Sequence, residues 1–438
     1  MDRYMMISQD CHAGAPWFVY RKYLDPKYRE EYERWATGVV GNLANLGSAE
    51  MEKEKPAQYE SMPVERKKEY LEAMERSMGH LGNWDPDVRA KELDREGIAG
   101  EVIFCDGSQK NHPPFSYSFF PGQVASPELR LAGCRAHNRW LAEFCQTNKG
   151  RHAGIAMITM DDVEETVKEI RWAKENGLFG GILLPALPLS VPSPSQGGDL
   201  YTRRLLEGKD SSGGGMAVDG PESFWHHPRY EPVWDVCEEL EMPVNTHATN
   251  SGVNYGGSPL VGIIENAFTT YRPFWCLLWG GVFERHPKLQ FCPTESGGMQ
   301  VLWFNAYFDE YMAKHRRPEW VKKAISMKPS DYWHRQCYVG ASAHSTRAEI
   351  DARYQIGVKN IMWGSDYPHP EGTWPVSMQR TKELFTGIPQ DEVSLMIGGN
   401  AARVYKFDVE SLQKIAAKIG PKVSDFSGGA TPMPSSGS

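Results

Sequence analysis

The chain has 438 residues, a net charge of −8 and an apolar content of 40%, with 14 Trp, 17 Phe and 19 Tyr. This length suits two or three average domains or one large α/β barrel, and the composition supplies a large core. The charge balance is mildly acidic and there is no long basic stretch. Nucleic acid and membrane surfaces are therefore not expected partners.

The cysteines and the apolar runs indicate a cytoplasmic protein. Eight cysteines are scattered without any C-x-x-C spacing, and several lie inside apolar runs, as buried free thiols do. The N-terminus lacks a basic region followed by a continuous apolar one, so no secretory signal is expected. No window reaches the ~18 uninterrupted apolar residues that a transmembrane helix needs.

Strands and helices alternate along most of the chain. The first strand, residues 4–12, is followed by a long polar stretch, 16–82, in which residues 65–78 read as an exposed helix. From Asp85, which is expected to cap a helix starting at Pro86, helices alternate with strands. A second long loop, rich in Pro, Ser and Gly, spans 185–229. The further strands are predicted at 101–104, 153–158, 181–184, 243–247, 289–295, 336–340 and 360–366.

This alternation predicts the α/β class and a parallel sheet. Eight β units favour a (β/α)8 TIM barrel over an open sheet, with long loop insertions after strands 1 and 4. We expect one domain over residues 1–408, carrying the insertions 16–82 and 185–229. Residues 421–438, rich in Ser, Gly and Pro, are expected to form a disordered tail.

Polar residues gather at the predicted C-terminal ends of four strands. They are Asp10 and His12 on the first strand, His247 on the fifth, Glu295 on the sixth and Asp366 on the eighth. Catalytic groups of such barrels come from these strand ends, and residues i and i+2 of a strand share one face. Mixed histidine and carboxylate ligands suit Zn²⁺, and carboxylate-rich sets also accept Mn²⁺ or Fe²⁺. The pattern predicts one divalent metal ion, with Zn²⁺ favoured.

Each of these residues also has a structural explanation when taken alone. Asp10 can cap a turn, Asp366 can be a turn aspartate, His247 can end a strand, and Glu295 can pair with a basic side chain. Their joint occurrence at strand ends favours the metal site. A metal-free binding protein on the same barrel is the alternative to a metal-dependent enzyme.

Three further histidines are candidates for substrate contact. His226 and His227 precede a helix in the second long loop, where they would touch substrate or cap the helix. His369 follows the last strand on the functional rim of the barrel. The aromatic residues of the two insertions indicate a small cyclic or aromatic substrate.

Four motifs together resemble a known family. They are Asp-x-His at 10–12, Asn-Thr-His at 245–247, Trp-Gly-Ser-Asp-Tyr-Pro-His-Pro at 363–370, and Gly-Asn-Ala-Ala-Arg-Val-Tyr at 399–405. This set is similar to the amidohydrolase 2 branch of the amidohydrolase superfamily, the branch typified by aminocarboxymuconate-semialdehyde decarboxylase. The resemblance covers about residues 4–408. It implies a homo-oligomer and a single divalent metal held by Asp10, His12, His247 and Asp366.

The chain departs from that branch at two positions. The family's decarboxylases usually have His-x-His or Glu-x-His on strand one, where this chain has the shorter Asp10. Strand six normally ends in a histidine that serves as acid and base, and Glu295 stands there instead. This glutamate favours a metal-dependent hydrolase, in which Asp366 or Glu295 takes the proton of a metal-activated water. The alternative is non-oxidative decarboxylation of an aromatic or dienoic acid.

Overall fold

The computed structural model describes residues 2–15, 17–43, 81–105, 112–116, 125–185, 224–248, 261, 264–265, 268–314, 324–341, 346–369 and 371–426. Most of both predicted insertions lies outside these residues, as does the helix predicted at 65–78.

The strands form a parallel (β/α)8 barrel, as the alternation predicted. They pair in the order β1–β2–β3, β4–β5–β6–β7 and β8–β9, and each of these pairs is parallel. The strands are β1 (Met6–His12), β2 (Ile98–Phe104), β3 (His152–Gly154), β4 (Ala156–Met157), β5 (Ile182–Leu183), β6 (Val244–Thr246), β7 (Phe291–Pro293), β8 (Val339–Ala341) and β9 (Ile361–Trp363).

One predicted strand, 153–158, is found as the two short strands β3 and β4. The break falls at Ile155, whose N–H bonds the carbonyl of Ile103 in β2, while the N–H of Ala156 bonds the carbonyl of Gly181 just before β5. At this point the chain changes its pairing partner from β2 to β5. The strands β3 and β4 therefore act together as one strand of the barrel wall between these two neighbours.

The barrel closes between the first and the last strand. The N–H of Asp366 bonds the carbonyl of Asp10 at 2.8 Å, and the N–H of His12 bonds the carbonyl of Tyr367 at 2.6 Å. Parallel bridges join Phe291 to Cys337 and Thr294 to Gly340, and so connect β7 to β8. With β3 and β4 counted as one strand, every strand therefore has neighbours on both sides, and the C-terminal strand ends meet around one mouth.

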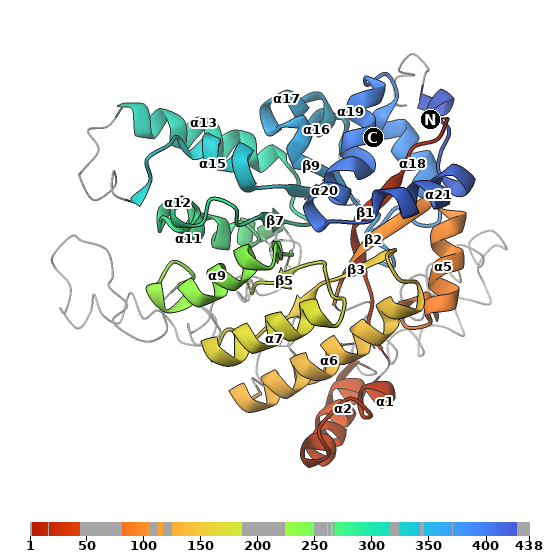
Figure 1. Ribbon diagram of the computed structural model, residues 1–438, viewed down its shortest axis with the longest axis vertical. Coiled ribbons are helices and arrows are strands. Elements are labelled where there is room, and N and C mark those ends of the chain that lie inside the picture. The colour runs from red at the N-terminus through yellow and green to blue at the C-terminus, as the bar shows by residue number, and fades with distance from the viewer. Residues whose placement is uncertain are drawn as a thin grey trace.

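Helices surround the strands, as Figure 1 shows. Local signals explain where several begin: Asp85 caps α5, Ser126 caps α6 and Asp162 caps α7, each accepting a backbone N–H with its side chain. The helices are α1 (Trp17–Tyr20), α2 (Arg29–Leu43), α5 (Pro86–Arg95), α6 (Pro127–Thr147), α7 (Val163–Glu175), α9 (Glu231–Glu239), α11 (Arg272–Trp279), α12 (Val282–Arg285), α13 (Met299–Lys314), α15 (Pro329–Gln336), α16 (Arg347–Asp351), α17 (Arg353–Ile356), α18 (Ser377–Phe385), α19 (Gln390–Ser394), α20 (Asn400–Tyr405) and α21 (Val409–Ile419).

The C-terminal part of the chain packs further than the sequence predicted. Beyond residue 408, α21 buries Leu412 and Ala416 against the β2 side of the core. The N–H of Tyr4 bonds the carbonyl of Pro421, and Phe426 is buried against the ring of Tyr4. These contacts place residues 421–426, the start of the predicted tail, against the N-terminal segment, and the disorder of that tail stays a prediction. Residues 427–438 lie outside the described part.

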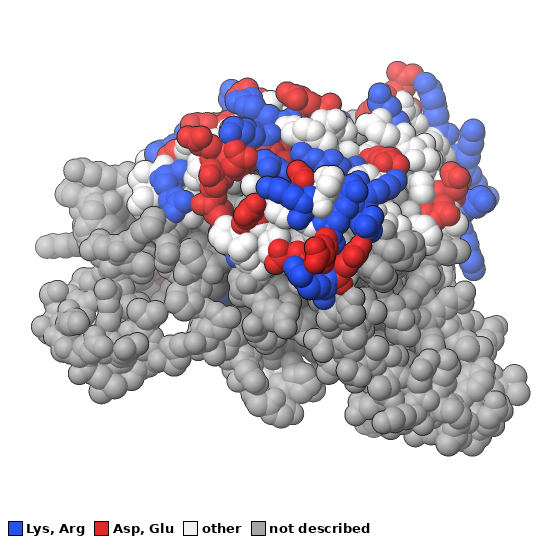
Figure 2. Space-filling view, turned by 90° about the horizontal axis from the view of Figure 1, so that it is seen from below, with Lys and Arg blue, Asp and Glu red and all other residues white. Residues whose placement is uncertain are grey.

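The described surface carries interspersed charge. On the face seen in Figure 2, Lys and Arg lie among Asp and Glu without separating into fields of one sign. Ion pairs contribute to this mixing, such as Lys27 with Glu128 and Lys22 with Glu143, which link the N-terminal segment to α6. Within the described ranges, no helix is long and apolar enough to span a bilayer.

Candidate metal centre

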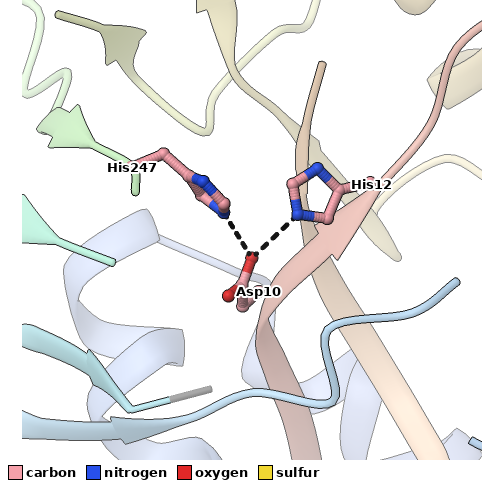
Figure 3. Close-up of side chains that lie close together, drawn as sticks. All are labelled: Asp10, His12 and His247. Atoms are coloured by element: carbon pink, nitrogen blue, oxygen red, sulfur yellow. Dashed lines mark hydrogen bonds and ion pairs between the residues drawn. The ribbon is translucent and has the colours of Figure 1, made fainter. Parts of the chain in front are cut away.

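The end of β1 supplies two of the candidate ligands. Asp10 and His12 point to the same side of the strand, and both are buried. The Nε2 atom of His12 lies 3.5 Å from Oδ1 of Asp10. Figure 3 shows the rings of His12 and His247 both directed at the carboxylate of Asp10.

His247 joins this pair from the opposite wall. It follows β6 directly, and its Nε2 atom lies 3.3 Å from Oδ1 of Asp10. Its ring stands edge-on to that of His12, with 4.7 Å between the centroids, and packs against Phe104. The barrel therefore brings together three candidate ligands that are far apart in the sequence.

Asp366 completes the group after β9. Its Oδ1 atom lies 3.3 Å from Nε2 of His12 and 3.1 Å from Nδ1 of His369. The residue has a left-handed backbone, with φ at 56°. Such a conformation is uncommon outside glycine and is found preferentially at functional sites, where the surrounding structure holds it in place.

Glu295 lies at the rim of the same group. Its Oε2 atom is 3.3 Å from Nδ1 of His247, and its side chain is 13% exposed, whereas Asp366 is fully buried. Glu295 also has a left-handed backbone, with φ at 57°, and its N–H bonds the carbonyl of Gly340. Of the two carboxylates predicted to act in catalysis, Glu295 is the one with access to solvent.

The electrostatics of the group favour a cation. Burial raises the pKa of Asp10, but His247 and His12 outweigh it and hold that pKa well below its usual range. Burial and His369 lower the pKa of His12, yet Asp10 and Asp366 bring it to about 9. Burial likewise lowers the pKa of His247, and the charges of Asp10 and Glu295 raise it above its ordinary value. The field here is negative, so positive charge is stabilised.

Unsatisfied buried atoms show that the residues fit a metal ion. Among the described residues, Oδ2 of Asp10, Nε2 of His12 and both carboxylate oxygens of Asp366 are buried without a hydrogen-bond partner. The Nδ1 atom of His12 lies 3.0 Å from the carbonyl of Cys105, which leaves Nε2 to face the group. Buried polar atoms without partners are costly, and a cation would satisfy all of them.

Comparison with known proteins decides the family. The amidohydrolase family model named Amidohydro_2 matches residues 112–407, more than half of the chain. The chain belongs to this amidohydrolase family.

Curated relatives of this amidohydrolase include decarboxylases. The 2-amino-3-carboxymuconate-6-semialdehyde decarboxylase of Dictyostelium discoideum is 22% identical over 329 residues, 74% of this chain and 77% of the relative. The gamma-resorcylate decarboxylase of Rhodococcus jostii is 26% identical over 348 residues, 74% of this chain and 88% of the relative.

A solved structure shares the fold of the amidohydrolase. It is a dihydroxybenzoic acid decarboxylase from Polaromonas sp. JS666, with bound manganese and the inhibitor 2-nitroresorcinol. The TM-score is 0.59 at 17% identity, covering 93% of this chain and 99% of that chain. At this identity the comparison establishes the barrel and its topology.

The three remaining candidate histidines of the amidohydrolase differ in position. The ring of His369 stacks on that of His12, with 3.9 Å between the centroids, so His369 lies at the site. His227 accepts the N–H of Arg229 and caps the 3-10 turn before α9, which is the structural alternative given for it above. His226 packs against Gly280, and neither His226 nor His227 joins the described groups that could share a metal. Substrate contact by these two stays a prediction.

Sequence reasoning missed a buried ionic network beside the site. Arg89 of α5 and Glu101 of β2 are fully buried, with 2.6 Å between Nη2 and Oε2, and Nδ1 of His152 lies 2.8 Å from Glu101. Nη1 of Arg89 also donates to the carbonyl of His12 at 3.0 Å. The network therefore fixes the backbone that presents His12. Its sequence signal is weak: one glutamate inside an otherwise apolar strand.

Proposed function

We propose that this amidohydrolase is a metal-dependent, non-oxidative decarboxylase of a small aromatic or dienoic carboxylic acid. The observation that carries the proposal is the buried group of Asp10, His12, His247 and Asp366 at the mouth of the barrel, with Glu295 at its rim. Three named relatives or fold neighbours are decarboxylases, which supports this reading over the hydrolysis that Glu295 suggested in the sequence.

The proposed metal ligands are Asp10, His12, His247 and Asp366. A bound divalent cation supplies a Lewis acid that can hold a carboxylate and an adjacent hydroxyl and balance their charge. Zn²⁺ was favoured from the ligand types, and the manganese of the Polaromonas enzyme makes Mn²⁺ the first metal to test. The carboxylate of Asp10 holds the rings of His12 and His247 in place through ion pairs. Its Oδ1 atom lies 3.5 Å from Nε2 of His12 and 3.3 Å from Nε2 of His247.

Glu295 is the proposed proton donor. Decarboxylation breaks the bond between the ring and the carboxylate carbon and forms a C–H bond at the same ring carbon, so one proton must be delivered and CO₂ leaves. Glu295 is partly exposed and can recover its proton from water after each turnover. Its contact with Nδ1 of His247 fixes its position, as general acid catalysis requires. Asp366, fully buried between His12 and His369, is assigned to ligation and to orienting those rings.

Hydrolysis is the second candidate function. The same residues can activate water, with Glu295 or Asp366 as the base, and the replacement of the usual strand-six histidine by glutamate favours it. A homo-oligomer and a cytoplasmic location remain predictions for either activity.

A substrate screen on metal-replete protein tests the proposal. The protein is stripped with a chelator, reconstituted with Mn²⁺ or Zn²⁺, and incubated with ortho-hydroxylated aromatic acids and with aromatic esters and lactones. CO₂ release from an acid, present only after reconstitution, supports decarboxylation. Ester or lactone cleavage without CO₂ from any acid would replace it by hydrolysis.

A further inference from the structure

The strand β1 contains a bulge just before its C-terminal end. Ser8 pairs with Glu101 of β2, and the next pair joins Cys11 to Ile103, so three steps along β1 correspond to two along β2. Side-chain contacts agree with this extra residue. Sγ of Cys11 lies 3.1 Å from Oγ of Ser8, although residues three apart in a regular strand face opposite sides. Bulges of this kind change the direction of side chains next to active sites.

The two residues inside the bulge, Gln9 and Asp10, both point into the barrel. The neighbours of β1 are β2 and β9, so its contacts with residues at the ends of β6 or β7 must cross the barrel. Oδ1 of Asp10 lies 3.3 Å from Nε2 of His247, and Nε2 of Gln9 donates to Oγ1 of Thr294 at 2.9 Å. Because the two residues share the bulge, the contacts that hold Gln9 also fix the direction of Asp10.

Tyr405 of α20 holds Gln9 from inside the barrel. Its ring belongs to the apolar cluster to which β1, β2, β7 and β9 contribute. Its hydroxyl accepts the Nε2 N–H of Gln9 at 2.9 Å and donates to Oδ1 of Asn245 in β6 at 2.7 Å. All three side chains are fully buried, where a polar group that loses its partner is costly. These hydrogen bonds therefore link β1 to β6, the strands that deliver Asp10 and His247.

The helix that carries Tyr405 is anchored to the last and the first strand. Nδ2 of Asn400 donates to the carbonyl of Ile361, the first residue of β9, at 2.8 Å. Just before α20, a Cβ atom on Gly398 would collide with the carbonyl oxygen of Met5, so a glycine is needed for this close approach to the start of β1. The closing motif at 399–405 thus places the Tyr405 hydroxyl firmly beneath the metal centre.

We propose that Tyr405 is a positioning residue of the metal centre, which acts through Gln9 on the bulge that aims Asp10. The inference rests on the proposed function, because it takes Asp10 as a metal ligand. Without the hydroxyl, Gln9 loses one of its two hydrogen-bond partners and Asn245 loses a donor. The bulge can then relax and move the Asp10 carboxylate relative to His247. Tyr405 itself touches neither the metal ligands nor the substrate in this role.

Isothermal titration of the metal-stripped protein with Mn²⁺ tests the positioning role. Tyr405→Phe removes only the hydroxyl and should weaken Mn²⁺ binding about tenfold or more, as the loss of groups that orient metal ligands does. Tyr332→Phe on α15 is the matched control, because it also removes a hydroxyl from a buried ring, one that accepts the N–H of Ser326 at 3.0 Å. The control should bind Mn²⁺ like the wild type. Equal affinities of the two variants would overturn the inference.

A double-variant cycle tests whether the effect passes through Gln9. Gln9→Met keeps the length of the side chain without its hydrogen bonds and should also weaken Mn²⁺ binding. If Tyr405 acts through Gln9, Tyr405→Phe/Gln9→Met should bind Mn²⁺ no more weakly than Gln9→Met alone. A merely structural tyrosine would lower the urea midpoint and leave no such coupling in metal affinity. Additive losses in the double variant would therefore contradict the proposed route.

Asp10→Asn distinguishes a failure of this inference from a failure of the proposed function. Weaker Mn²⁺ binding in Asp10→Asn, with wild-type binding in Tyr405→Phe, would refute the positioning role and leave the proposed ligands in place. Wild-type binding in Asp10→Asn would remove Asp10 from the ligands and overturn both. Weaker binding in both variants, with no CO₂ release from any acid by the Mn²⁺-replete wild type, would refute decarboxylation and support the positioning role.

Discussion

The Nε2 atom of His12 lies 3.3 Å from Oδ1 of Asp366, so the first and the last strand of the barrel meet at the proposed metal centre. Two backbone hydrogen bonds across the closure, Asp366 to Asp10 and His12 to Tyr367, set this distance. The site therefore depends on the closed barrel as well as on its four side chains. Changes on either side of the seam, the junction between β1 and β9, should affect metal binding.

Replacing Asp366 by Asn should weaken metal binding while the protein still folds. The amide keeps the size of the side chain but lacks the charge that a divalent cation requires. We expect Mn²⁺ binding weakened by more than about 100-fold, the upper end of losses measured even for residues that only support a metal ligand, and turnover abolished. Isothermal titration calorimetry measures the binding. The exposed Asp351→Asn on α16 should bind like the wild type, and equal affinity in the two variants would argue against ligation by Asp366.

A glycine at the seam gives a second test. A Cβ atom on Gly364 would lie 2.6 Å from Cβ of Asp10 and 3.0 Å from its backbone nitrogen, so Gly364→Ala must push β1 and β9 apart. We expect a loss of about 1–3 kcal/mol in the free energy of unfolding and weaker Mn²⁺ binding. In β2, a Cβ atom on Gly100 would lie 3.0 Å from the flexible end of Leu412 and at ordinary contact distance, 3.4 Å, from the Arg151 carbonyl and the Phe407 ring, so Gly100→Ala should retain metal affinity. Unchanged Mn²⁺ affinity in Gly364→Ala would show that the seam does not control the site.

The sequence predicted the centre because barrel geometry makes strand ends converge. His12, His247 and Asp366 each stand at the end of a predicted strand, and the eight β units required the first and last strands to be neighbours. The same reasoning placed Glu295 and His369 at the mouth, where the structure has them. Such a prediction needs only strand direction and order.

Features that depend on side-chain packing were beyond that reasoning. The pairing of Arg89 with Glu101 joins a helix to a strand, and no local periodicity shows which of the many arginines and glutamates are buried partners. The packing of Phe426 on Tyr4 joins the two ends of the described chain in the same way. Nothing in the composition of 421–438 distinguishes its first six residues from a solvated tail.

Removing only one partner of the buried Arg89–Glu101 ion pair should lower the free energy of unfolding strongly. Arg89→Met leaves Glu101 buried beside His152 without its guanidinium, and we expect a loss of about 3–5 kcal/mol in the free energy of unfolding. The double variant Arg89→Met/Glu101→Gln should recover part of it. Arg171→Met, which breaks an exposed ion pair with Glu239, is the control and should leave the urea midpoint nearly unchanged. An equal effect of the two arginine variants would contradict the buried role.

Glu349 should make stability depend on pH near neutrality. Burial raises its pKa to about 7, although the N–H groups of Gly298 and Thr346 oppose the shift. Because this pKa lies above the ordinary 4.5, the stability it contributes is full below about pH 4.5 and is lost as the pH rises through 7. Relative to the wild type, Glu349→Gln should gain about 2–3 kcal/mol between pH 5 and pH 8. Urea unfolding at both pH values measures this gain.

The exposed Glu410→Gln on α21 provides the baseline for that comparison, because the side chain of Glu410 is solvated in the folded and in the unfolded protein. A Glu349→Gln variant that tracks the wild type at both pH values would mean that Glu349 is ionised throughout. A gain at pH 8 that is absent at pH 5 would assign the titration to this carboxyl.

In the proposed reaction, the metal centre and Glu295 remove a carboxylate without adding water to the product. The most direct test is incubation of Mn²⁺-replete protein with an acid that it consumes, in ¹⁸O-labelled and deuterated water. For decarboxylation we expect one CO₂ per product molecule, one deuterium at the carbon that lost the carboxylate, and no ¹⁸O in the organic product. An organic product that carries ¹⁸O, formed without CO₂, would rule out decarboxylation and establish hydrolysis.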